Sequence, residues 1–114
     1  MTPARAQSLV WLAQRASAAA LALFVVVHLA TMIVAVRGGL TAAEILARTR
    51  GSGAWATFYG VFVVAVAIHA PIGVRTVVAE MRGGHHRVAD GIALLLGVLI
   101  AALGARAVVA VTGS

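Results

Sequence analysis

The chain has 114 residues, of which 62% are hydrophobic and only 11% are charged. A soluble domain carries roughly 25% charged residues, and so short a soluble chain could not bury this much apolar surface. The net charge of +6 comes from arginines alone, and these lie at the ends of apolar runs rather than along one polar face. The composition therefore excludes a soluble globular protein, argues against nucleic-acid binding and predicts a single membrane domain, residues 1–114.

Three apolar runs predict three transmembrane helices, at about residues 12–36, 55–80 and 90–111. Each run reaches the roughly 20 residues needed to cross a hydrocarbon core. Backbone polar groups must be satisfied internally at that depth, so all three runs should be helical. The first run is long enough to span and lacks the cleavage site of a signal peptide, so we expect it to be retained. The predicted fold class is an all-α membrane protein.

The connection between the first and second spans is too polar to cross the membrane. Its segment Thr41-Ala-Ala-Glu44 has the form of a capping box, with Thr41 as N-cap and Glu44 at the third helical position. The pattern predicts a short surface helix at about residues 42–48. The second connection, residues 82–90, is short and polar, so the second and third spans should be antiparallel neighbours.

Arginine positions give the expected orientation. With antiparallel spans, five arginines fall on the side of the N-terminus and four on the other side, which favours a cytoplasmic N-terminus. The five are Arg5, Arg15, Arg75, Arg82 and Arg87. His85 and His86 are expected on the same side, solvated in the second connection.

Two histidines, His28 and His69, lie deep inside the first two predicted spans. An ionisable side chain at a helix centre costs roughly 3 kcal/mol, so such residues usually mark a function. An imidazole at that depth binds a metal or haem, relays protons, or hydrogen-bonds a neighbouring helix. Electron-transferring haem iron takes two axial side chains, and imidazole is a common choice. Two such histidines with arginines at the helix ends favour haem, and simple interhelical hydrogen bonding is the alternative.

Helical spacing places each histidine on a stripe of aromatic and small residues. In the first span the stripe consists of Ser17, Leu21, Phe24, His28 and Ala35. In the second span it consists of Phe58, Phe62, Ala65, His69, Gly73, Thr76 and Glu80. In the third span Gly97, Ala101 and Gly104 form a small-residue face that is expected to pack closely on another helix.

Hydrogen-bond donors cluster where the first span begins and the second ends. Trp11, Arg15 and Ser17 mark the first span, and Arg75 marks the end of the second. Indole, guanidinium and hydroxyl donors at one interface could hold a quinone carbonyl or a haem propionate. The alternative is plain anchoring at the membrane interface.

Two of these segments resemble a known family. Gln14-Arg15-Ala16-Ser17-Ala18 and His69-Ala-Pro-Ile-Gly73-Val-Arg75 are similar to motifs of the cytochrome b membrane anchors of succinate dehydrogenase and fumarate reductase. That family shows an Arg-x-Ser start to its first helix and a His-x-x-x-Gly-[hydrophobic]-Arg motif in its second. The similarity runs over about residues 9–82, with a third span of matching length.

The resemblance implies a three-helix anchor in a bacterial inner membrane that binds haem b and quinone and holds a flavoprotein and an iron–sulfur subunit. His69 takes the family's haem-ligand position, and Arg15 that of its quinone-site arginine. Trp11 stands where some members carry a quinone-site serine, and His28 resembles the first-helix ligand of two-haem members. The chain would be an electron-transfer subunit, since the absence of cysteine and flavin motifs leaves no dehydrogenase site on it.

We expect one or two haems per complex, shared with a second anchor chain or a second copy of this one. If Arg75 marks the membrane interface, His28 should lie in the outer half of the membrane and His69 in the inner half, offset by roughly 10 Å, so they should not ligate the same iron. If Glu80 marks the interface instead, the offset shrinks to about 4 Å, which would allow a shared iron. Two alternatives remain open: a haem-free anchor of the same complex, or the cytochrome b subunit of another membrane dehydrogenase.

Overall fold

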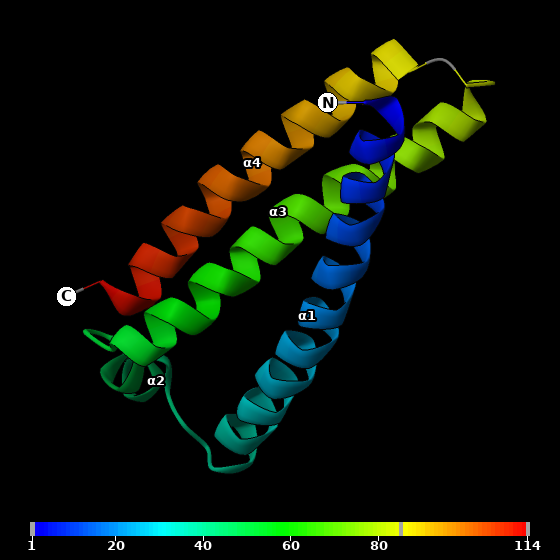
Figure 1. Ribbon diagram of the computed structural model, residues 1–114. Coiled ribbons are helices and arrows are strands. Elements are labelled where there is room, and N and C mark those ends of the chain that lie inside the picture. Colours follow the sequence, from blue (N-terminus) through cyan, green and yellow to red (C-terminus); the bar gives the residue numbers. More distant parts are fainter. Residues whose placement is uncertain (1, 85, 114) are drawn as a thin grey trace.

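The computed structural model describes residues 2–84 and 86–113, which form four α-helices joined by short connections (Figure 1). In chain order these are α1 (Pro3–Arg37), α2 (Ala42–Thr49), α3 (Gly53–Met81) and α4 (His86–Thr112). α1, α3 and α4 are each long and apolar enough to cross a membrane. The predicted all-α class, with three long helices and a short one between the first and second, is confirmed.

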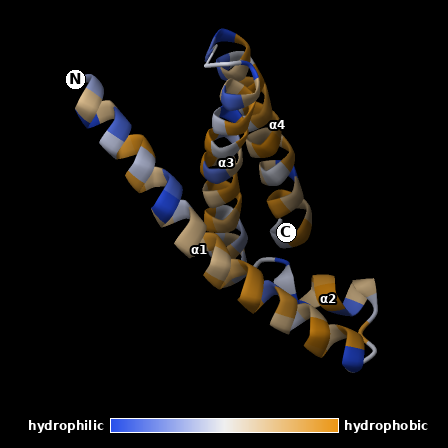
Figure 2. Cartoon of the chain, turned by 90° about the vertical axis from the view of Figure 1, so that its right-hand side faces the viewer, coloured by the Kyte–Doolittle hydropathy of each residue, from blue (hydrophilic) through white to orange (hydrophobic). Residues whose placement is uncertain are grey.

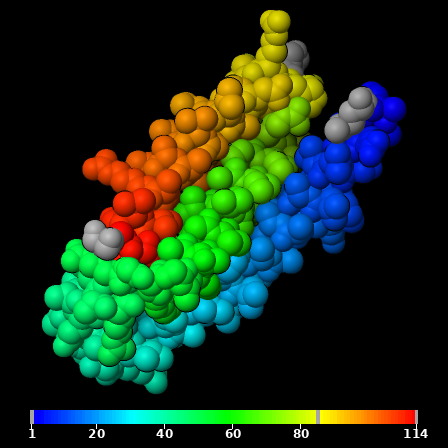
Figure 3. Space-filling model, turned by 60° about the vertical axis from the view of Figure 1, so that its left-hand side comes forward, coloured from blue at the N-terminus to red at the C-terminus, as the bar shows by residue number. Residues whose placement is uncertain are grey.

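The central helix of the fold is α3. It packs against α1 on one side and α4 on the other, and Figure 3 shows it in green between blue α1 and orange α4. α3 and α4 are antiparallel neighbours, as predicted. The N-terminal end of α1 and the α3–α4 connection lie at one end of the molecule, and α2 lies at the other (Figure 1). Hydrophilic residues gather in the N-terminal part of α1, at the α3–α4 connection and around α2 (Figure 2).

Side-chain caps fix where the first three helices begin. Thr2 caps α1 by accepting from the Arg5 backbone N–H at 3.3 Å, so this helix starts well before the predicted span. Thr41 and Glu44 form both hydrogen bonds of the predicted capping box, at 3.2 and 2.7 Å. Ser52 caps α3. Each cap satisfies backbone donors that the first helical turn leaves free, and the predicted surface helix is confirmed.

The second connection is shorter than predicted, because α4 already begins at His86. His86 is an exposed residue of the first helical turn, and its expected place in a loop was wrong. Outside the hydrocarbon core water can satisfy the first backbone N–H groups, so a helix need not start where its apolar run starts. Packing also favours the early start, since Ala89 is 0% exposed. His85 lies outside the described residues.

Two glycines allow α3 and α4 to approach closely. A Cβ added at Gly104 would lie 2.5 Å from Cγ1 of Val63, closer than real contacts allow. A Cβ at Gly97 would lie 3.3 Å from Cγ of Pro71. The predicted small-residue packing is confirmed at both glycines, whereas Ala101 is exposed and lies beside this contact line.

Candidate functional site

The helices that carry the two histidines meet at Ser17 of α1 and His69 of α3. The Ser17 side chain is buried, at 6% exposure, and its Oγ lies 3.4 Å from Nδ1 of His69. The same hydroxyl contacts the backbone oxygen of Gln14 at 3.0 Å. Within the described residues Nε2 of His69 has no hydrogen-bond partner, so this nitrogen remains available for a ligand.

Gln14 lies one helical turn before Ser17 on α1, and Gly73 lies one turn after His69 on α3, so both border the Ser17–His69 contact. A Cβ built on Gly73 would come within 3.4 Å of Nε2 of Gln14, which is an ordinary van der Waals distance. Oε1 of Gln14 is buried, and no residue in the described part of the chain hydrogen-bonds it. A flexible polar side chain therefore occupies the space that the predicted haem slot would need beside Gly73, and its oxygen could accept a further hydrogen bond.

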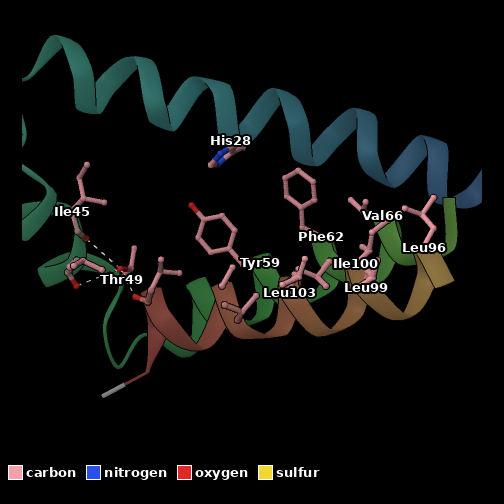
Figure 4. A pocket seen from close by; sticks show the side chains of 16 residues that line it. His28, Ile45, Thr49, Tyr59, Phe62, Val66, Leu96, Leu99, Ile100 and Leu103 are labelled. Carbon is pink, nitrogen blue, oxygen red and sulfur yellow. Dashed lines mark hydrogen bonds between the residues drawn. The ribbon is translucent and has the colours of Figure 1, made fainter. Parts of the chain in front are cut away.

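His28 lies in different surroundings. Its ring points from α1 toward Tyr59 and Phe62 of α3 (Figure 4), with ring centroids 5.8 and 6.1 Å away and near-perpendicular planes. Nδ1 of His28 is buried and has no hydrogen-bond partner among the described residues. The ring lines a cavity of about 800 Å³ whose walls come from all four helices and are almost entirely apolar. Cavities of this size are typical of small-molecule and cofactor sites.

The two histidines do not come together within one chain. His69 is level with Ser17, which lies eleven residues before His28 on α1, or about 16 Å along the helix axis. On α3, Tyr59 lies ten residues before His69, or about 15 Å. Two nitrogens bound to one iron are only about 4 Å apart, given metal–nitrogen bonds of roughly 2 Å. The separation is too long for His28 and His69 of one chain to bind the same iron.

Arg15 and Trp11 lie on another face of α1. The Arg15 guanidinium carbon sits 4.9 Å from the centre of the Trp11 ring, in a cation–π contact. Both residues are exposed, Trp11 at 60%. Ser17 faces α3 instead, so the three donors expected at one interface do not converge on a common point within this chain.

Arg75 is engaged at the end of α3. Its Nε donates to Oδ1 of Asp90 in α4 at 2.5 Å, in an exposed ion pair that ties the two helices together. Thr76 and Glu80, predicted to share a stripe with His69, are exposed. Figure 2 shows the reason: the N-terminal part of α1 diverges from α3 and leaves this end of the stripe without a neighbour.

In the described part of the chain no group of three or more His, Asp or Glu side chains could hold a metal ion by itself.

The sequence model of the succinate dehydrogenase/fumarate reductase transmembrane subunit matches residues 1–106. The chain belongs to this family. No curated protein and no solved structure gives a significant match.

The family explains why the long helices expose so much apolar surface, because its members are transmembrane subunits. The chain is a multi-pass membrane protein and a member of a succinate dehydrogenase/fumarate reductase complex. Its exposed leucines and valines, such as Leu23, Val26 and Leu94, are suited to lipid or to other membrane chains.

Two residues of these sites escaped the sequence analysis. Gln14 was noted only as part of a motif, although its position one turn before Ser17 places it on the same face of α1. Tyr59 lies beside the predicted aromatic stripe and next to Phe58 in the sequence. Its contact with His28 depends on how α1 and α3 align along their lengths, which no local pattern reveals.

Proposed function

We propose that this chain is the haem b-binding, quinone-site anchor subunit of a succinate:quinone oxidoreductase, placed between the iron–sulfur subunit and quinone. One observation carries the proposal. His69 lies inside a membrane-spanning helix and has its Nδ1 next to the buried Ser17 hydroxyl, and no described residue hydrogen-bonds its Nε2. Metal-ligating histidines almost always donate a hydrogen bond from their other ring nitrogen, and the Ser17 hydroxyl oxygen is an acceptor within reach of Nδ1.

The donor groups present, two imidazoles and several guanidinium groups, are of the kinds that hold a haem, and the Gln14 side chain beside Gly73 would have to move aside for it. His69 and His28 would each hold a separate iron, and arginine side chains would pair with the propionates. The buried, unpartnered Nδ1 of His28 supports a ligand role there, because an unsatisfied buried polar group costs about 1–3 kcal/mol unless something binds it. A bound haem b would supply reversible one-electron chemistry inside the membrane.

A second membrane chain completes this proposal. Haem b with two axial ligands needs a partner for each histidine, and the two histidines lie about 16 Å apart along α1. A second copy of this chain or a similar three-helix anchor would supply the missing ligands. The proposal also includes a flavoprotein and an iron–sulfur subunit on the cytoplasmic side of a bacterial inner membrane, the side of the N-terminus.

For quinone we assign the main contact to Arg15. Its exposed guanidinium can donate hydrogen bonds to a quinone carbonyl, and Trp11 stacks against it. The Ser17 hydroxyl already contacts Gln14 and His69, so we assign it to the histidine rather than to quinone. Arg75 is paired with Asp90 and would reach a propionate only by giving up this ion pair.

A haem-free anchor is the second candidate, and the Ser17–His69 contact alone would suit it as an interhelical hydrogen bond. A reduced-minus-oxidised absorbance spectrum of the purified complex separates the two. A b-type spectrum supports the proposal. A featureless spectrum from fully assembled complex with active soluble subunits favours the haem-free anchor.

A further inference from the structure

We propose that Ser17 is a positioning residue that fixes the tautomer and orientation of the His69 ring, so that Nε2 presents the lone pair a metal binds. The proposal rests on the haem-ligand role proposed above. Its basis is a chain of two hydrogen bonds that links α3 to α1, from the His69 ring through the Ser17 hydroxyl to the Gln14 backbone oxygen.

The direction of this chain follows from the Gln14 carbonyl, which can only accept. Ser17 has one hydroxyl proton, and the contact of 3.0 Å with Gln14 uses it. Toward Nδ1 of His69, 3.4 Å away, the Ser17 oxygen then offers only lone pairs. A neutral imidazole carries a single N–H. The arrangement that satisfies both contacts therefore places this hydrogen on Nδ1 and leaves Nε2 unprotonated.

Burial makes Ser17 the determining partner. With only 6% of Ser17 exposed, bulk water cannot readily replace its oxygen beside the ring. In a site of low dielectric such a hydrogen bond is electrostatically stronger than in water. His28 has no equivalent within residues 2–84 and 86–113, where its buried Nδ1 finds no hydrogen-bond partner. The His69 ring is therefore oriented by a hydrogen bond before any metal binds, whereas the His28 ring is not.

The hydrogen bond has a measurable consequence for a bound iron. An acceptor on the distal ring nitrogen raises the basicity of the ligating nitrogen, and loss of such a partner typically weakens metal binding 10–100-fold. More basic ligation favours the more highly charged, oxidised iron. A tenfold loss of this preference in Ser17→Ala would raise the reduction potential by about 59 mV for a one-electron couple.

The experiment is a redox titration of the haem in the purified complex, with wild type, Ser17→Ala, Ser17→Thr and Thr31→Ala compared. Thr31 is the matched control, because its hydroxyl donates to a backbone oxygen of α1, that of His28, at 2.7 Å. We expect Ser17→Ala to raise the potential, and Ser17→Thr and Thr31→Ala to stay near wild type. An unshifted Ser17→Ala, or an equal shift in Thr31→Ala, would overturn the proposal.

If Ser17→Ala fails to assemble, Ser17→Cys replaces it. A thiol is a weak acceptor, so the potential should rise by less than expected for alanine, and an unchanged potential again refutes the role of Ser17. Different results would refute the haem-ligand role of His69 and the positioning role of Ser17. A wild-type complex without haem refutes the haem-ligand role of His69. A haem whose reduction potential is the same in wild type and in the Ser17 variants refutes only the inference about Ser17.

Discussion

Replacing His28 with leucine should make the haem-free chain more stable and the haem-containing complex less stable. Nδ1 of His28 is buried and has no partner among the residues that the structure describes, and such a group costs about 1–3 kcal/mol. Leucine removes this cost and can pack against Tyr59 and Phe62, the ring neighbours of His28. We therefore predict that His28→Leu raises the free energy of unfolding of the haem-free chain by about 1–3 kcal/mol. In the complex assembled with haem, His28→Leu should instead lower stability, because leucine cannot ligate iron.

The assay is unfolding in detergent, followed by far-ultraviolet circular dichroism, on chain purified from cells that cannot make haem. His86→Leu is the matched control, since His86 is exposed at the start of α4. Surface substitutions of this kind usually change stability by less than about 0.5 kcal/mol. A haem-free His28→Leu chain that is less stable than wild type would refute the reasoning, as would a gain no larger than that of His86→Leu.

Three further outcomes are expected. Arg15→Leu should lower quinone reduction while dye reduction by the soluble subunits survives, and equal loss of both would indicate an assembly defect instead. Gly104→Ala should destabilise the α3–α4 contact by about 1–3 kcal/mol in thermal unfolding, because its Cβ would overlap Val63, whereas Gly91→Ala meets nothing within 4 Å and should change little. If His28 and His69 serve different irons, the complex should contain two haems per flavin; a single haem bound by both histidines of one chain would contradict this.

Local sequence patterns predicted the elements that local interactions determine. Thr41 and Glu44 specify their own helix start, because both partners of the capping box lie within four residues. Likewise the apolar length of each span follows from composition alone. The start of α4 was misplaced because the burial of Ala89 and the ion pair of Asp90, both in its first turns, depend on tertiary packing.

The site was predicted only as far as single-helix geometry reaches. Helical spacing put Ser17 and His28 on one face of α1 and His69 on a face of α3. It could not give the alignment of the two helices, which decides that Ser17 rather than His28 lies beside His69. The divergence of α1 from α3, which exposes Glu80, also depends on how the helices cross.

The role of His69 as an axial haem ligand can be decided by the absorbance of assembled complex that carries His69→Ala, measured against His86→Ala. Both variants remove one imidazole, and only His69 faces the Ser17 contact inside the membrane. The proposed role predicts that His69→Ala abolishes or shifts the b-type absorbance at full subunit occupancy, while His86→Ala leaves it unchanged. An unaltered spectrum in His69→Ala would contradict the assignment.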